Sequence, residues 1–367
     1  MHSTSLIYYN THLRGSIDWI LRSVDAGGGG SSAYYSSLLG WSAPYPETSG
    51  YIIPTLLNAS NELDDRSLEV VAIKVGEWLL TLQSKDGWWP CGLYKSRSSK
   101  SGPSVFNTGQ IIDGMVALAS HTGDSRWSIA AIRAANWLAD AVDEQGLWSI
   151  GNYRKGSNPS YYTHVAWPML LAWRLGASES IRDAAIRVLQ RIIALRTPKG
   201  VFRGWSFDSD KPAFTHTIAY TLRGFIECAV LLEDWHSFGA PCEAALDRLA
   251  RKAEFTHGRL PGAYSEEWKP INWYTCLTGN AQIAICLLRM EQHSPDLRLV
   301  NAAEKLISNV CNHQRINSGR TKIRGAVSGS APLWGRYMFM RYPNWAVKYH
   351  ADALMMLSHR LKTEGLQ

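Results

Sequence analysis

The stretch Gly87-Trp88-Trp89-Pro90-Cys91-Gly92 decides the fold, because weaker copies of it recur along the chain. Each copy is a short turn-forming segment bounded by glycines. Their closing glycines lie 53 to 63 residues apart, at Gly92, Gly151, Gly204, Gly262 and Gly325. A period of this length is typical of repeat architectures, in which each repeat is one supersecondary unit packed on its neighbours. The spacing therefore predicts helical-hairpin repeats of about 58 residues.

Two kinds of helical segment flank these turns. The segment before each turn has apolar residues at spacings of three and four and charged residues on the other side, which is typical of an outer helix. Six such segments cover residues 13–24, 70–82, 129–142, 181–195, 242–253 and 297–310. The segment after each turn, such as Ile218 to Leu232, opens with a small polar residue and is apolar all round, as in a fully buried inner helix.

Six outer and six inner helices in alternation predict an all-α, closed (α/α)6 toroid. We expect it to form a single domain spanning residues 1–367. An open α-solenoid is the competing arrangement, because helical pairs of this size also stack linearly. The strongly apolar inner segments favour the closed ring.

The composition limits the function classes. The chain has 367 residues, 46% apolar and 19% charged, with a net charge of +7, which excludes a disordered, collagen-like or coiled-coil protein. No apolar run reaches the length of a membrane span, and the N-terminus lacks a secretory signal, so a cytoplasmic protein is expected. Six scattered cysteines without a Cys-x-x-Cys pair predict free thiols. We expect no metal centre and no cofactor.

Three resemblances support this fold. The phrase Gln83-Ser84-Lys85-Asp86-Gly87-Trp88-Trp89 resembles the Gln-Trp repeat of the squalene-cyclase and protein-prenyltransferase toroids. The run from Trp273 to Ala284, followed by Asn301-Ala302-Ala303, resembles the helical domain of uronate carbon-five epimerases over about thirty residues. The whole pattern is also similar to repeat proteins of bacterial polysaccharide gene clusters. These likenesses imply a toroid and a saccharide substrate.

The active sites of the first two families are not retained. A terpenoid cyclase of this type uses an Asp-x-Asp-Asp motif, whereas this chain has Asp208-Ser209-Asp210-Lys211, with a cation in the last position. A zinc prenyltransferase uses an Asp and a Cys two residues apart, where this chain has Tyr274-Thr275-Cys276. Terpenoid cyclisation in an aromatic cavity therefore remains only a distant alternative.

The openings of the inner helices are expected to converge on one end of the toroid axis and to line a shared pocket there. His164 and His216 occupy the same position in successive repeats, and histidine suits proton transfer near neutral pH. Tyr162 and Tyr220 are the candidate partners on the opposite face. The expected substrate-binding residues near these openings are Tyr51, Asn107, Gln110, Arg223, Trp273, Tyr274, Asn280, Asn344 and Lys348.

Two acidic residues and a set of aromatic residues complete the candidate site. Glu47 and Asp113 lie in otherwise apolar segments, where an unpaired carboxylate is costly, so they are a second candidate catalytic pair. Aromatic side chains on the connecting loops are expected to surround the mouth and to stack on sugar rings. They are Trp89, Trp148, Trp205, Trp334 and Tyr337.

These residues predict a carbohydrate-active enzyme of bacterial polysaccharide metabolism that binds an acidic oligo- or polysaccharide. Proton transfer at a uronate carbon, as in an epimerase or a polysaccharide lyase, is the preferred reaction, with Arg223 and Lys348 binding the carboxylate. The alternatives are a glycoside hydrolase using Glu47 and Asp113, and a glycan-binding protein without catalysis. No nucleic acid and no membrane span are expected as partners.

Overall fold

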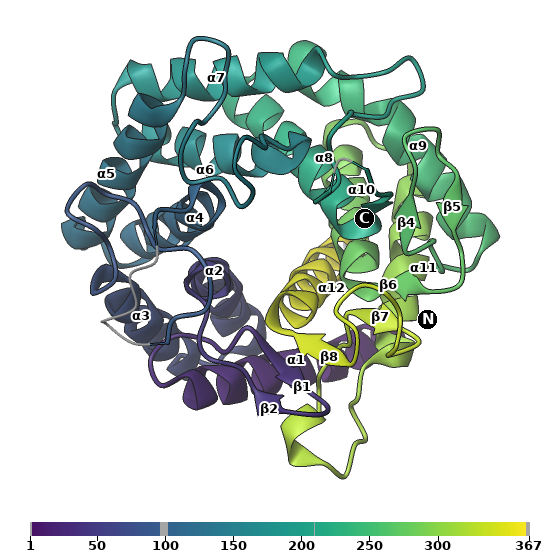
Figure 1. Ribbon diagram of the computed structural model, residues 1–367. Coiled ribbons are helices and arrows are strands. Elements are labelled where there is room, and N and C mark those ends of the chain that lie inside the picture. The colour runs from purple at the N-terminus through teal and green to yellow at the C-terminus, as the bar shows by residue number, and fades with distance from the viewer. Residues whose placement is uncertain (1, 96–101, 209, 365–367) are drawn as a thin grey trace.

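The computed structural model describes residues 2–95, 102–208 and 210–364. In this part of the chain, twelve α-helices form two concentric rings (Figure 1). The outer ring contains α1 (His2–Gly27), α3 (Ser67–Leu80), α5 (Ser125–Ala141), α7 (Glu179–Ile193), α9 (Ala240–Phe255) and α11 (Leu297–His313). The inner ring contains α2 (Pro46–Leu63), α4 (Val105–Thr122), α6 (Thr163–Arg174), α8 (Thr215–Leu232), α10 (Leu277–His293) and α12 (Asn344–Glu364).

The ring is closed. Each inner helix contacts the next one, and α12 contacts both α2 and the first outer helix, α1. The closed (α/α)6 toroid is therefore confirmed, and the open solenoid is wrong.

Each end of the ring has its own kind of connection. The segments that lead into inner helices are long, and they carry all the strands and two of the short helices in the described residues; we call this the loop end (Figure 1). The passages from an inner helix to the next outer helix are mostly short, such as 64–66 and 123–124, and form the short-connection end. The short elements are β1 (Tyr34–Ser36), β2 (Gly40–Trp41), η1 (Ser160–Tyr162), β3 (Ala213–Phe214), η2 (Trp235–Gly239), β4 (Ala263–Tyr264), β5 (Pro270–Ile271), β6 (Thr275–Cys276), η3 (Thr321–Ile323), β7 (Ser330–Ala331) and β8 (Arg341–Pro343).

The strands form small antiparallel sheets that join distant parts of the chain. One sheet has the order β2-β1-β8 and pairs Tyr35 with Tyr342, which ties the first repeat to the last. The others are β3-β4-β5 and β6-β7. These sheets are too small to carry the core, which lies between the two helical rings.

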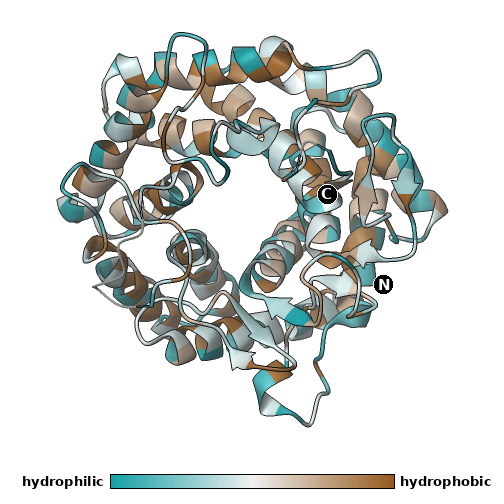
Figure 2. Cartoon of the chain, in the orientation of Figure 1, coloured by the Kyte–Doolittle hydropathy of each residue, from teal (hydrophilic) through white to brown (hydrophobic). Residues whose placement is uncertain are grey.

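The outer helices follow the predicted amphipathic pattern. In α7, Ile181, Ala184, Val188 and Ile192 are buried, while the charged residues face outward. Hydrophobic and hydrophilic segments accordingly alternate along this helix in Figure 2. Periodicity is a sufficient signal here because only one face of each outer helix is buried. None of the described helices is long and apolar enough to cross a membrane.

Glycines near the starts of inner helices let neighbouring helices approach closely. A Cβ atom on Gly50 of α2 would lie 2.6 Å from Cα of Ile111 in α4. A Cβ atom on Gly279 of α10 would lie 2.7 Å from the backbone nitrogen of His216 in α8. Real Cβ contacts are not this short, so any larger residue would push the inner ring apart.

Three loop tryptophans are buried in the protein and are not at a sugar-binding mouth. The Nε1 atom of Trp89 donates to the carbonyl oxygen of Leu79 at 2.8 Å, and Trp148 donates to Leu138 at 2.9 Å. Trp205 is 1% exposed and contacts Trp268 edge to face. The expectation that Trp89, Trp148 and Trp205 stack on sugars is wrong, because each of the three side chains is at most 1% exposed.

Candidate functional site

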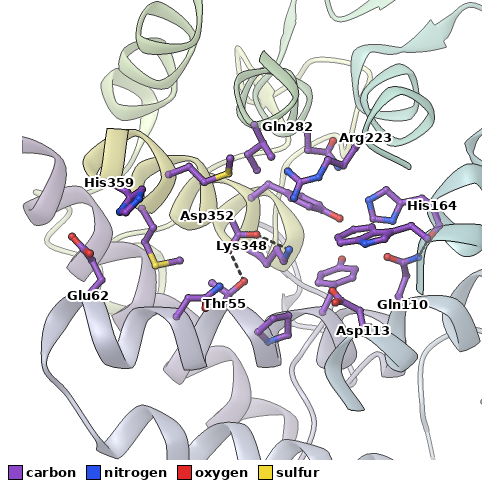
Figure 3. Close-up of a pocket in the computed structure, with 18 of the residues that line it drawn as sticks. Thr55, Glu62, Gln110, Asp113, His164, Arg223, Gln282, Lys348, Asp352 and His359 are labelled. Carbon is purple, nitrogen blue, oxygen red and sulfur yellow. Dashed lines mark hydrogen bonds and ion pairs between the residues drawn. The ribbon is translucent and has the colours of Figure 1, made fainter. Parts of the chain in front are cut away.

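An axial cavity of about 460 Å³ lies inside the inner ring. Its closed end lies near the loop end, where Gln110 and His164 are buried, and its mouth lies at the short-connection end, beside Glu62 and His359 (Figure 3). The described lining residues come from all six inner helices: Tyr51, Pro54, Thr55, Asn58, Glu62, Gln110, Asp113, His164, Trp167, Arg223, Gln282, Ile285, Gln292, Lys348, Tyr349, Asp352, Met355, Met356 and His359. At 1.5 Å per residue, the path along α2 from Tyr51 to Glu62 is about 16 Å long.

Aromatic rings pack between this cavity and the loop end. The ring of Tyr161 lies 5.5 Å from that of Phe207, which lies 6.2 Å from Phe214, and Phe214 lies 5.1 Å from Tyr337. Beneath them Tyr220 is 2% exposed. The cavity therefore opens at the end opposite to the one that we predicted from the loop aromatics.

The closed end carries polar atoms without partners. In the described residues, Nδ1 of His164 and the hydroxyl of Tyr51 are buried and make no hydrogen bond. The carbonyl oxygen of His164 accepts a hydrogen bond from Nε2 of Gln110 at 2.9 Å, which holds the start of α6 against α4. Burial, reinforced by the charges of Arg223 and Lys348, lowers the pKa of His164 well below its usual value. A neutral imidazole and a hydroxyl are thus available to a ligand.

An ion pair within α12 lies on the cavity wall (Figure 3). The ammonium of Lys348 lies 2.6 Å from Oδ2 of Asp352, and the hydroxyl of Thr55 donates to Oδ1 of Asp352 at 2.7 Å. The ammonium also lies 4.3 Å from the ring centre of Tyr349. These contacts hold the Asp352 carboxylate in one orientation on the cavity wall.

Asp113 is a carboxyl group with an unusual proton affinity. Its pKa is raised to about 6, mainly by burial and also by the carboxylates of Asp352 and Glu227, against the opposing effects of Lys348 and Arg223. A carboxyl group with a pKa close to neutral can both give and take a proton, which is the requirement for general acid–base catalysis. The pKa of His164 is instead well below its usual value, so Asp113 is the better proton-transfer group near neutral pH.

Arg223 enters the cavity from a buried ion-pair network. Its Nε atom lies 2.6 Å from Oε1 of Glu227, and Arg289 contacts both oxygens of the same carboxylate at 2.7 Å. The guanidinium of Arg223 lies 5.4 Å from the ring centre of Trp167. The Glu227 carboxylate thereby fixes the one arginine that lines the cavity among the described residues.

Solved structures with this architecture are known. No family model and no curated protein matches the chain. A cellobiose 2-epimerase from Bacillus thermoamylovorans superposes with a TM-score of 0.78 at 10% identity, covering 98% of this chain and all of that one. The likeness establishes the fold.

Two further structures have the same relation to the chain. An unsaturated glucuronyl hydrolase from a Bacillus species, described as responsible for glycosaminoglycan degradation, gives a TM-score of 0.74 at 13% identity and covers 94% of this chain and 96% of its own. A sugar epimerase from a ruminal bacterium gives 0.74 at 13%, with 97% and 99% covered. All three match over nearly the whole toroid, including the inner helices that line the cavity.

Several residues predicted for the site lie elsewhere. His216 is buried outside the cavity, where its Nδ1 lies 2.7 Å from Oε1 of Gln282, and Tyr220 packs between the two histidine rings. The hydroxyl of Tyr162 donates to Asn152. The structure thus brings only one member of the predicted histidine pair to the cavity.

The predicted asparagines and loop aromatics are also outside the cavity. Asn107 donates to the carbonyl oxygen of Pro90, Asn280 to that of Gly258, and Asn344 to the hydroxyls of Ser23 and Ser31. Each amide therefore joins the start of an inner helix to an adjacent loop or to α1. Tyr274 and Tyr337 are buried at the loop end, and Trp273 and Trp334 are exposed away from the cavity.

Glu47 lies in the first turn of α2 and does not line the cavity. Its side chain is almost fully buried, and burial raises its pKa to about 7, against the effect of a hydrogen bond from Tyr45. Glu47 and Asp113 are therefore not a pair across one cavity, and Asp352 is the second carboxylate beside Asp113.

Replacing Glu47 by glutamine should stabilise the protein at pH 8 by up to about 3 kcal/mol and leave its stability at pH 4 unchanged. A carboxyl pKa that is higher in the folded state costs stability as the pH rises from about 4.5 to about 7, and glutamine has no such cost. Urea unfolding at both pH values measures the difference. The exposed Glu144→Gln serves as control. An equal effect of Glu47→Gln at the two pH values would contradict the argument.

Sequence reasoning missed residues in the middle and at the ends of the inner helices. Asp352, Thr55 and Trp167 line the cavity, and so do Glu62 and His359 at its mouth. The signal that could have found them is helical spacing from the predicted residues, because Asp352 follows Lys348 by four positions and therefore shares its face.

Proposed function

We propose that this chain is a carbohydrate-active enzyme that takes the end of an acidic saccharide into the axial cavity, with Asp113 as the proton-transfer group. The observation that carries the proposal is the floor of the cavity, where the unpartnered atoms of His164 and Tyr51 lie in the same cavity as Asp113. A cavity closed at one end suits a chain terminus. The enzymes of the same fold named above act on saccharides, which supports this substrate class.

Each lining group then has a role in binding a sugar. The aromatic faces of Trp167, Tyr51 and Tyr349 contact the apolar faces of sugar rings, and Gln110 and Gln282 bind hydroxyl groups. Arg223 and Lys348 neutralise the carboxylate of a uronic acid, each while keeping its own acidic partner. The His164 imidazole accepts a hydrogen bond from a sugar hydroxyl at the floor.

Hydrolysis is favoured by the second carboxylate. Asp113, protonated in part at neutral pH, donates its proton to the glycosidic oxygen, and the Asp352 side chain lies in the same cavity beside Lys348. Two carboxyl groups in one cavity are the arrangement that glycoside hydrolysis requires.

Proton transfer at a uronate carbon is favoured by the two cations. In this reaction Asp113 removes the proton next to the carboxylate, and Arg223 and Lys348 stabilise the negative charge that develops. The product is an epimer if the proton returns on the other face. It is an unsaturated sugar if a leaving group departs.

Incubation with uronate-containing and neutral oligosaccharides in deuterated water separates these reactions. New reducing ends without deuterium in the sugar indicate hydrolysis, deuterium at the uronate carbon indicates epimerisation, and ultraviolet absorbance from a new double bond indicates a lyase. We expect one of these products from a uronate-containing substrate and none from neutral glucans. Turnover of neutral substrates alone would overturn the acidic specificity, and no turnover or binding across the panel would overturn the proposal.

A further inference from the structure

A second cluster of chemically active side chains lies outside the cavity, where the first helix of the chain meets the last two. His12 of α1, Cys311 of α11 and His350 of α12 each offer one ligand atom, and these atoms lie within 4.8 Å of one another. All three residues are buried, with His350 fully inaccessible. The cluster lies between the two rings, on the side of α12 away from the cavity, and the proposed function does not use it.

A glutamine side chain is held so that its oxygen faces both histidines. The Oε1 atom of Gln314 lies 2.6 Å from Nδ1 of His12 and 3.3 Å from Nε2 of His350. Its Nε2 atom has three acceptors, the carbonyl oxygens of His12 and Gly325 and the hydroxyl of Ser16. Because the amide nitrogen is fixed on all sides, the oxygen cannot turn away from the cluster.

We propose that His12, Cys311 and His350 bind one Zn²⁺ ion, and that the side-chain oxygen of Gln314 holds the His12 ring in place by a hydrogen bond to Nδ1. Two imidazoles and a thiol form a donor set that zinc prefers, and four-coordinate tetrahedral geometry is the rule for structural zinc. With bonds of about 2.0–2.3 Å, tetrahedral ligand atoms lie roughly 3.4–3.6 Å apart. The Sγ atom of Cys311 already lies 3.8 Å from Nε2 of His350. Side-chain rotations that move the ligand atoms by about 1 Å therefore complete the site.

The position of this site gives the ion a structural role. Closure of the ring depends on contacts between α1 and α12, whose residues are more than 300 positions apart in the chain. A metal bound by α1, α11 and α12 joins these helices by strong bonds. Binding transfers the Cys311 thiol proton to water as the zinc–sulfur bond forms.

The test uses the full-length protein after treatment with a chelator. We expect it to bind one Zn²⁺ per chain, measured by elemental analysis after gel filtration, and its melting temperature to rise by roughly 5 °C or more with excess zinc. Substitution with Co²⁺ is expected to give the near-ultraviolet absorption of a thiolate–cobalt bond. This spectrum is read on the unmodified protein and so does not depend on whether a variant folds.

Variants then assign the ligands. Cys311→Ser should abolish the cobalt band and weaken zinc binding at least about 100-fold, and Gln314→Ala should weaken it about 10- to 100-fold. Cys242→Ser is the matched control, since Cys242 is equally buried but lies in α9, remote from the cluster. Absence of stoichiometric zinc from the unmodified protein, or a cobalt band that survives Cys311→Ser, would overturn the proposal.

Discussion

Replacing Asp113 by asparagine is expected to reduce turnover at least 100-fold while making the folded protein more stable at neutral pH. The loss of turnover follows from removing the proton-transfer group, whose contribution is typically about 100- to 10,000-fold. The gain in stability follows from the pKa of Asp113, which is about 6 in the folded protein against an ordinary value of 3.8. An asparagine does not ionise, so it avoids the cost of charging this partly buried group, up to about 2 kcal/mol above pH 6.

The two measurements are turnover of the substrate found in the product screen and urea unfolding at pH 7.5 and pH 4. Asp247→Asn is the matched control, because Asp247 is an exposed aspartate on α9, and it should change neither quantity. A variant at Asp113 that keeps full turnover would remove this residue from the mechanism. A loss of both turnover and stability at pH 7.5 would instead indicate a structural role.

Replacing Glu227 by alanine is expected to cost about 3–5 kcal/mol of unfolding free energy. The carboxylate is 8% exposed and is the shared partner of Arg223 and Arg289. Burial alone would raise the pKa of Glu227, but the two guanidinium groups outweigh it and hold the pKa below its usual value. Without the carboxylate, two partly buried cations face each other with no compensating charge.

Chemical denaturation of the variant measures this cost. Asp247→Ala removes a carboxylate from a surface pair and should cost less than about 1 kcal/mol. Glu227→Gln should fall between the two, because it keeps one hydrogen-bond acceptor. A cost below 1 kcal/mol for Glu227→Ala would mean that Arg223 and Arg289 reach water once the carboxylate is gone.

The helical rings could be predicted from sequence because their signals are local. The outer helices show periodic apolar positions, as in α7, and the inner helices are apolar all round, as in α8. The glycine-bounded turns between them recur at a nearly constant spacing. Closure of the ring could also be predicted, because an inner helix that is apolar all round must be covered on every side.

The candidate site was predictable only in part. Gln110, Asp113, His164 and Lys348 stand out as polar residues in apolar segments, and all of them line the cavity. The mouth was placed at the wrong end because exposed loop aromatics and buried ones look the same in a sequence. Whether a tryptophan stacks on a ligand or donates to the outer helix before it, as Trp148 does, depends on tertiary packing.

The metal-ligand cluster could not be predicted at all from spacing. His12 and Cys311 are separated by almost the whole chain, and neither belongs to a short motif. Their neighbourhood exists only because the ring closes and sets α1 against α11 and α12. Long-range clusters of this kind require the fold before the residues can be recognised.

The six inner helices all run in the same direction, from the loop end to the short-connection end. Peptide dipoles in a helix add up to a partial positive charge at its start and a partial negative charge at its finish. Six positive helix ends therefore surround the closed floor near His164 and Tyr51, and six negative ends surround the mouth near Glu62. The fold itself creates an electric field along the axis that orients an acidic chain end with its charge toward the floor.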